Sequence, residues 1–197
     1  DADVDLTPYQ LVIAPMLYMV RDGFAGRAEA FVANGGHLVT TYWTGIVNES
    51  DLCYLGGFPG PLRNLLGIWA EEIDCLNDGE FNLVQGLAGN QCGLQGPYQV
   101  RHLCELIHIE SAQALATYRD DFYAGRPAVT VNAFGKGKAW HVASRNDLAF
   151  QRDFFTALSK ELALPRAIAT ELPPGVVATA RTDGDNAFIF LQNYSAQ

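Results

Sequence analysis

Two cysteines, a histidine and a glutamate are the residues of this sequence that could together support nucleophilic catalysis. Cys53 and Cys92 precede the segment His108-Ile109-Glu110. A thiol enzyme needs a cysteine on a sharp strand-to-helix turn, beside a histidine that a carboxylate orients. Cys92 fits such a turn best, because glycines lie one position after it and three positions before it. The candidate catalytic set is therefore Cys92 or Cys53, with His108 as base and Glu110 as orienting carboxylate.

The His-x-Glu segment resembles that of class I glutamine amidotransferases, in which the cysteine lies far upstream. Here Cys92 precedes His108 by only sixteen positions, and no apolar strand leads into it. Cys53 lies further upstream but has no glycine beside it. An amidotransferase-like thiol enzyme is therefore the alternative function, and the simpler interpretation is an alternating strand that carries a partly buried histidine.

A metal site in this region would require His102, Cys104 and His108 to converge on one ion. On a strand all three share the even-numbered face, but they extend over about 20 Å, which is too far for a single ion. The adjacent carboxylates at 71–72 and 120–121 point apart, so neither pair predicts an acid–base dyad. The glycines of FGKGKAW lack the spacing of a phosphate loop. We therefore expect no catalytic, metal-binding or cofactor-binding residues in this chain.

The elements that would position these residues follow from hydrophobic periodicity. Residues 10–14 predict a buried strand of a mostly parallel sheet, and residues 37–43 predict a second strand. Between them lies a predicted helix whose inward face consists of Phe24, Ala28, Phe31 and Val32. This strand–helix–strand order predicts a three-layer α/β domain.

The rest of the chain predicts shorter elements. A short helix begins at Pro61, extended segments follow it, and hairpins occupy residues 100–142. A second amphipathic helix begins at the N-cap Asn146, and its predicted inward face consists of Leu148, Phe154, Phe155, Leu158 and Leu162. Residues 172–176 predict a linker, and residues 176–194 predict a hairpin around Asp183-Gly184.

Composition and charge argue against several classes of partner. The 197 residues carry 13 basic and 22 acidic side chains, which is a formal net charge of −9. This sign repels nucleic acid and anionic lipid, and no basic cluster offsets it locally. No apolar stretch reaches the ~18 residues that crossing a bilayer requires. The four cysteines are too sparse for a disulfide scaffold, so we expect reduced thiols and a cytoplasmic protein.

Many of the aromatic residues gather around one loop, residues 43–62, which glycines and prolines stiffen. Rigid aromatic side chains on a stiff loop are typical anchors of protein–protein interfaces. We therefore predict that this loop contacts another protein. The candidate interface residues are Trp43, Tyr54, Phe58, Pro59 and Trp69.

Three segments together resemble one family of proteins. They are LVIAPMLYMV, FVANGGHLVTTYWTGIVNESDLCYLGGFPGPLRNLLGIWAEEID and DDFYAGRPAVTVNAFGKGKAWHVAS, and they are similar to the middle domain of the family-42 β-galactosidases. The similarity extends over residues 9–165. It implies a flavodoxin-like, glutamine-amidotransferase-like three-layer fold, whose role in that family is to assemble the enzyme as a homotrimer.

The same resemblance implies how the chain relates to a larger parent protein. In that family a (β/α)8 barrel hydrolyses terminal β-D-galactosides with retention, using two glutamates, and a small β-sandwich follows the middle domain. We therefore expect residues 1–170 to be a non-catalytic trimerisation domain, inactive by itself, and residues 171–197 to be a linker and the start of the β-sandwich. A strand–helix–strand segment is expected before Tyr9, and DADVDL is too short to provide it. The expected partners are further copies of the chain, and the barrel and C-terminal β domain of the same parent chain.

Overall fold

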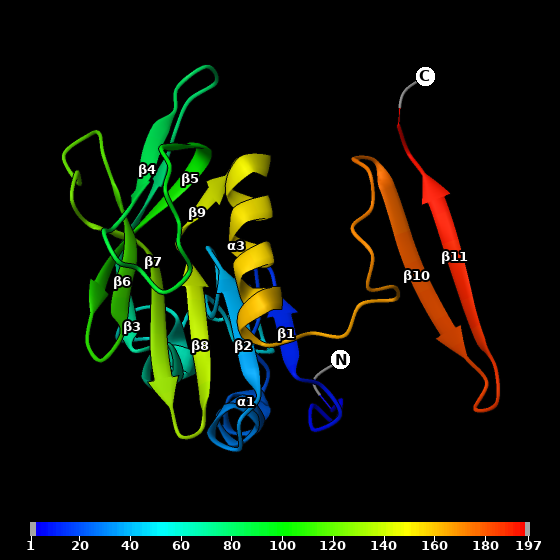
Figure 1. Ribbon diagram of the computed structural model, residues 1–197. Coiled ribbons are helices and arrows are strands. Elements are labelled where there is room, and N and C mark those ends of the chain that lie inside the picture. The colour runs from blue at the N-terminus through cyan, green and yellow to red at the C-terminus, as the bar shows by residue number, and fades with distance from the viewer. Residues whose placement is uncertain (1–2, 196–197) are drawn as a thin grey trace. The chain divides into compact units, whose positions relative to one another are not determined.

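The computed structural model describes residues 3–195, which form two compact units. The first unit ends at Glu161 and the second begins at Leu162. Figure 1 shows the sheet and helices of the first unit and the hairpin of the second. The domain boundary predicted after residue 170 lies beyond the end of the first compact unit.

Nine strands of the described residues form the sheet of the first unit, in the order β1-β2-β8-β7-β6-β4-β5-β3, with β9 beside β5. They are β1 (Leu11–Ala14), β2 (His37–Thr41), β3 (Ile68–Cys75), β4 (Asn82–Gly86), β5 (Tyr98–Ile109), β6 (Gln113–Tyr118), β7 (Pro127–Phe134), β8 (Gly137–Val142) and β9 (Ser144–Asn146). The pairings β1–β2 and β2–β8 are parallel, and the other pairings that the structure describes in this sheet are antiparallel. The prediction of a mostly parallel sheet therefore holds only for β1, β2 and β8, and the sheet as a whole is mixed. The short connection between β7 and β8 reverses the chain and makes that pair antiparallel.

Helices cover both faces of the parallel part of the sheet. Helix α1 (Phe24–Ala33) packs into the same core cluster as Leu38 of β2. Helix α3 (Leu148–Glu161) packs into the cluster that contains the next residue, Val39. Because successive side chains of a strand point to opposite faces, α1 and α3 lie on opposite sides of β2. The buried helix residues are Ala28, Phe31 and Val32 in α1, and Phe150, Phe154 and Leu158 in α3. The predicted α/β class is thus confirmed.

The start of α3 differs from the prediction. The carboxylate Oδ1 of Asp147 accepts a hydrogen bond from the backbone N–H of Phe150 at 2.9 Å, so Asp147 rather than Asn146 caps the helix. The Asn146 side chain is buried and donates to Ser144 instead. Leu148, predicted to face inward, is 76% exposed, and Phe150 is buried in the first turn. The predicted inward face is therefore confirmed at Phe154 and Leu158, but not in the first turn, and the predicted Leu162 lies beyond the end of the helix.

The short helix expected at Pro61 consists of a 3-10 turn, η1 (Gly60–Leu62), and helix α2 (Arg63–Leu66). Gly67 ends α2 with a φ of 63°, a left-handed conformation that glycine adopts without strain. Strand β3 begins directly after it and pairs with β5. This connection ties the far end of the loop 43–62 to the sheet.

In the second unit, β10 (Val176–Thr182) and β11 (Ala187–Asn193) form an antiparallel hairpin. The carboxylate of Asp183 accepts a hydrogen bond from the N–H of Asn186 at 2.9 Å and so stabilises the turn. The hairpin predicted around Asp183 is therefore confirmed. Across the described residues of both units, no helix is long and apolar enough to cross a membrane.

Candidate functional site

The two cysteines of the proposed catalytic set lie in different environments. Cys92 is buried in the core cluster on the α3 side of the sheet, and burial raises the pKa of its thiol to about 11. A thiol with such a pKa is almost entirely protonated near neutral pH and is a poor nucleophile. Cys53 is exposed in the loop, where it forms an isolated β-bridge with Val47. Cys92 is therefore unsuited to nucleophilic attack, and Cys53 lies within a loop rather than at a strand-to-helix turn.

His108 and Glu110 form two separate ion pairs near the end of β5. Nε2 of His108 lies 2.6 Å from Oε2 of Glu71, and its ring stacks on Trp69 at a centroid distance of 4.4 Å. The hydrogen bond from His108 lowers the pKa of Glu71. Glu110 binds Arg63 through two hydrogen bonds, of 2.5 and 2.9 Å. Because both side chains are engaged with other groups, the alternative thiol-enzyme set is not assembled.

The three residues considered for a metal ion do not share a face. His102 has a φ of 69° at a break in the β5 pairing, where the register with β9 shifts, and its side chain is exposed. Cys104 is buried, and His108 is stacked on Trp69. Within residues 3–195, no group of three or more His, Cys, Asp or Glu side chains is arranged to hold a metal ion.

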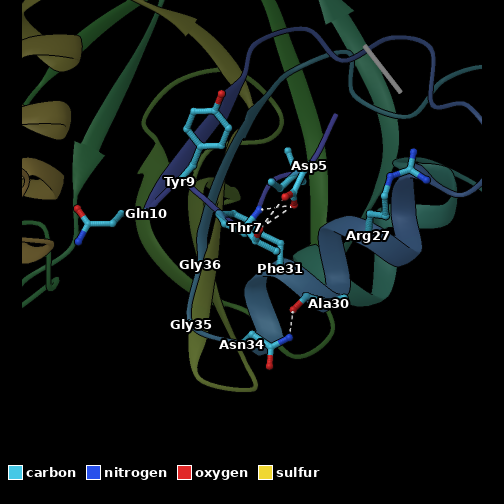
Figure 2. Close-up of a pocket in the computed structure, with 11 residues that line it drawn as sticks. Asp5, Thr7, Tyr9, Gln10, Arg27, Ala30, Phe31, Asn34, Gly35 and Gly36 are labelled. Carbon is cyan, nitrogen blue, oxygen red and sulfur yellow. Dashed lines mark hydrogen bonds between the residues drawn. The ribbon is translucent and has the colours of Figure 1, made fainter. Parts of the chain in front are cut away.

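Two clefts of the first unit have no cysteine or histidine among their described lining residues. The first, of about 390 Å³, lies between residues 5–10 and α1 (Figure 2). There Asp5 accepts hydrogen bonds from the N–H and hydroxyl of Thr7, and the bond from the N–H is the larger reason why its pKa is lowered. The second, of about 370 Å³, lies at the carboxyl ends of β1, β2 and β8, where open α/β sheets usually bind ligands. Its described lining contains no Cys, His, Asp or Glu.

The loop 43–62 is held by a close approach of its two ends and by hydrogen bonds to neighbouring segments. Gly45 has a φ of 66°, and a Cβ atom there would lie 2.1 Å from the carbonyl oxygen of Pro59. The hydroxyl of Tyr54 donates to the carbonyl of Val20 at 2.6 Å. The N–H of Ala70 donates to the carbonyl of Phe58 at 2.7 Å. The loop is therefore a defined surface rather than a free connection.

The predicted interface residues differ in how far they reach the surface. Pro59 is buried, and Tyr54 and Phe58 are half-buried against the core cluster on the α1 side. Trp43 is exposed, and Leu55, which was not predicted, is 98% exposed at the loop tip. Leu52 is exposed as well. The available signal was the pattern of single leucines between polar residues and glycine in DLCYLGG.

Trp69 is covered by His108 and Arg63, and Arg63 also contacts the loop tip. His108 stacks on its ring, and the guanidinium carbon of Arg63 lies 5.7 Å from the ring centroid. Nη1 of Arg63 donates to the carbonyl of Gly56 at 3.2 Å, directly after Leu55. Arg63 thus links Trp69 to the loop tip, where Leu52 and Leu55 are exposed.

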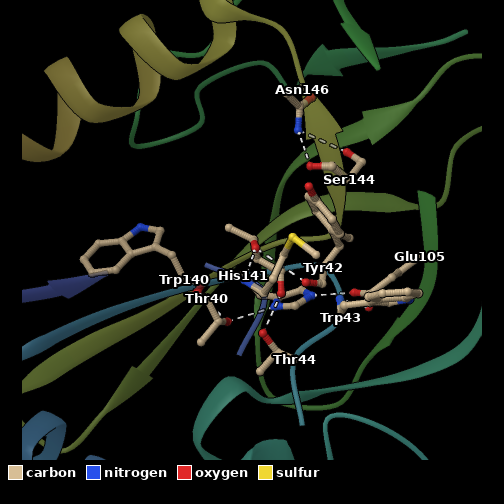
Figure 3. Close-up of polar contacts among 12 residues, drawn as sticks. Thr40, Tyr42, Trp43, Thr44, Glu105, Trp140, His141, Ser144 and Asn146 are labelled. Atoms are coloured by element: carbon tan, nitrogen blue, oxygen red, sulfur yellow. Dashed lines mark hydrogen bonds and ion pairs between the residues drawn. The ribbon is translucent and has the colours of Figure 1, made fainter. Parts of the chain in front are cut away.

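A buried polar network that sequence reasoning missed contacts the start of the loop at Trp43 (Figure 3). Glu105 of β5, His141 of β8 and Thr40 of β2 are at most 2% exposed. Nε2 of His141 lies 2.8 Å from Oε2 of Glu105, and Nδ1 lies 2.9 Å from Oγ1 of Thr40. The order hydroxyl–imidazole–carboxylate is that of a catalytic triad, but its burial excludes a substrate. The available signal was a charged or polar residue within the apolar runs CELIHI and AWHVA.

Comparison with known proteins identifies one group of relatives. A family model described as the β-galactosidase trimerisation domain matches residues 1–165. β-Galactosidase Pbg of Clostridium perfringens is 53% identical over 195 residues, which are 99% of this chain and 28% of that protein. β-Galactosidase BglY of Alicyclobacillus acidocaldarius is 52% identical over 197 residues, which are 100% of this chain and 29% of that protein. The chain thus spans less than a third of the length of these relatives.

Solved structures agree with these relatives. The crystal structure of a cold-adapted β-galactosidase from Rahnella sp. R3 matches with a TM-score of 0.97 at 66% identity, over 100% of this chain and 29% of that chain. The structure of a β-galactosidase from Bacillus circulans sp. alkalophilus matches with a TM-score of 0.93 at 43% identity, again over 100% of this chain and 29% of that chain.

Proposed function

The chain belongs to the β-galactosidase trimerisation domain family, and from this premise we propose that it joins three copies of a parent β-galactosidase without taking part in bond cleavage. The family description supports the assembly role. The absence of a role in catalysis is supported by the protonated, buried Cys92 and by His108 and Glu110, which are engaged in other ion pairs. The sheet with helices on both faces supports a flavodoxin-like, amidotransferase-like scaffold that has been adapted to assembly.

The parent protein is proposed to be a retaining glycoside hydrolase that acts on terminal β-D-galactosides in carbohydrate catabolism. Its relatives are named β-galactosidases, and the matched region is 28% or 29% of their length. The catalytic barrel and a C-terminal β-sandwich, which the hairpin β10–β11 would open, are proposed to belong to the same polypeptide. Four free thiols among the described residues favour a reducing, cytoplasmic location.

The observation that carries the assembly role is the braced loop with its exposed leucines. Leu55 is 98% exposed on a loop that Arg63 holds through Gly56. Burying a leucine side chain contributes about 1.5–3 kcal/mol, and a loop that is already ordered loses little entropy when it binds. Leu52, Leu55 and Trp43 are therefore proposed as the anchors of the contact, with Tyr54, Phe58 and Trp69 as their support.

The test is the oligomeric state of the 197-residue chain, measured by light scattering over a range of concentrations. Leu55→Asp is expected to shift the trimer toward monomer, because a carboxylate would be buried in the contact. Leu148→Asp is the matched control, because Leu148 is also an exposed leucine, at the first turn of α3, where a carboxylate is tolerated. A wild-type chain that remains monomeric at high concentration, or a Leu55→Asp trimer as stable as the wild type, would contradict the proposal.

Activity of the chain provides a second test. The purified 197-residue chain is expected not to hydrolyse a chromogenic β-galactoside. Stoichiometric, reproducible turnover by the pure chain would show that it carries catalytic groups of its own.

A further inference from the structure

Trp43 opens the loop in a backbone conformation that a tryptophan rarely adopts. Its φ is 59°, in the left-handed region where bulky side chains are strained and glycine is the usual residue. Its backbone N–H donates to Oε1 of Glu105 at 2.7 Å. Such a short hydrogen bond to a carboxylate is stronger than one between neutral groups. Glu105 therefore stabilises a conformation that the backbone would otherwise avoid.

Glu105 is itself fixed from its other side. Its second carboxylate oxygen is bound by His141, which is bound by Thr40, and the Thr40 hydroxyl also lies 3.2 Å from the carbonyl oxygen of Trp140. Figure 3 shows this chain of contacts leading from the strands to Trp43. A buried ionisable pair is weak evidence for stability, since apolar residues of similar volume often serve as well. We therefore interpret the network as fixing the position of the Glu105 carboxylate, and through it the backbone of Trp43.

The side chain of Trp43 reaches the surface beside Tyr18. The two ring centroids are 6.0 Å apart, and both residues are exposed. The carbonyl of Tyr18 accepts a hydrogen bond from the N–H of Ile46 at 2.9 Å, which joins Tyr18 to the loop. Trp43 and Tyr18 thus form one aromatic pair that continues the surface of loop 43–62.

We propose that Glu105 is a positioning residue that sets the Tyr18–Trp43 pair as a contact surface for a second copy of this chain. The proposal rests on the proposed assembly function and adds to it a surface residue, Tyr18, and a buried residue that fixes the surface. Glu105 acts through the backbone of Trp43 and does not itself touch the partner.

A second copy is the partner that the family description and the position of the pair favour. Each copy carries a formal net charge of −9, which opposes association of copies, so a contact between them has to gain its stability from uncharged groups. Tyrosine and tryptophan are uncharged, and they are among the residues that most often dominate binding energy at interfaces. The pair is also continuous with the loop that carries the proposed assembly anchors.

The experiment compares Glu105→Ala with Thr40→Val in the 197-residue chain. Both changes break the network, but only Glu105→Ala removes the acceptor of the Trp43 N–H. The trimer dissociation constant, from sedimentation equilibrium, is expected to rise about tenfold or more in Glu105→Ala, because a hydrogen bond to a charged group is lost. In Thr40→Val the dissociation constant is expected to stay within about twofold of the wild type, although Tm falls.

Two further variants separate positioning from general stability. Glu105→Gln keeps an amide oxygen that accepts from Trp43, so it is expected to restore assembly. Tyr18→Ala leaves the network intact and is expected to weaken assembly, whereas Tyr9→Ala, at another exposed tyrosine, is not. If Glu105→Ala does not fold, the comparison of Tyr18→Ala with Tyr9→Ala still tests whether the Tyr18–Trp43 pair forms the contact surface. Glu105→Gln then tests whether a hydrogen-bond acceptor at position 105 is sufficient for assembly.

Hydrogen exchange makes failure of this proposal distinguishable from failure of the assembly function. Exchange of the Trp43 backbone amide is expected to accelerate about tenfold or more in Glu105→Ala, and not in Thr40→Val, whatever the oligomeric state. A monomeric wild type overturns the assembly function. If the wild type is trimeric but Glu105→Ala and Thr40→Val weaken assembly equally, only the positioning role is overturned. The same holds if exchange of the Trp43 amide is unchanged in both variants.

Discussion

Arg63 and Glu110 form a two-bond ion pair, with Nη2 to Oε1 at 2.5 Å and Nε to Oε2 at 2.9 Å, that connects α2 to the residues following β5. The same guanidinium donates to the carbonyl of Gly56 at 3.2 Å. Two points of the chain that are far apart in sequence therefore hold the tip of loop 43–62. The His-x-Glu segment that suggested catalysis thus contributes its glutamate to bracing a surface loop.

Removal of this brace is expected to loosen the loop tip. Arg63→Ala should increase hydrogen exchange of residues 55–57 several-fold, because Gly56 loses a partner and Leu55 loses its support. Glu171→Gln, which removes the partner of another arginine, Arg166, in the second unit, is the matched control and should leave these amides unchanged. Equal protection of residues 55–57 in wild type and Arg63→Ala would show that the loop is held by other contacts.

The same pair predicts a dependence of stability on acidity. The hydrogen bond from Arg63 lowers the pKa of Glu110 below its usual value of 4.5, and His108 does the same for Glu71. The unfolded chain therefore takes up protons first as pH falls, and the stabilisation present above pH 4.5 is lost as pH falls through the folded-state pKa. The difference in Tm between wild type and Glu110→Gln should be measurable at about pH 7 and should shrink progressively as pH falls below 4.5. A difference in Tm that persists in acid would mean that the Glu110 side chain contributes through packing rather than through its charge.

Thiol labelling distinguishes structural from reactive cysteines. Burial raises the pKa of Cys92 and of Cys104 to about 11, whereas Cys53 and Cys75 are exposed. Two thiols are therefore expected to react with iodoacetamide in the native chain, and the other two only after unfolding. Mass spectrometry of labelled peptides identifies them. Rapid labelling of Cys92 in the native chain would revive the thiol-enzyme alternative.

Truncation of the α3 face should show which residues of that helix carry stability. Phe154→Ala removes a fully buried ring and is expected to lower the free energy of unfolding by about 3–5 kcal/mol. Leu148→Ala, at an exposed position of the same helix, is expected to change it by less than about 0.5 kcal/mol. Urea unfolding followed by circular dichroism provides both values. A large effect of Leu148→Ala would mean that this residue is buried in an assembly.

The sequence by itself determined the local elements, because apolar periodicity acts over a few residues. The spacing of apolar residues in 24–33 is sufficient to predict the buried face of that helix. The turn residues around Asp183 are sufficient to predict the hairpin. The resemblance in residues 9–165 also led to the correct family, since a long ordered match is more specific than any single motif. Glycines and prolines indicated that loop 43–62 is stiff.

Only the tertiary structure decided which distant residues meet. Strand β8 inserts beside β2, about a hundred positions earlier in the chain, and this parallel pairing places His141 next to Thr40. The strand β5 then supplies Glu105 to His141 and to the backbone of Trp43. No local pattern encodes these pairings, because sheet register depends on the packing of side chains over the whole domain. The sequence could therefore indicate a stiff aromatic loop, whereas long-range sheet pairing decided how its first tryptophan is held.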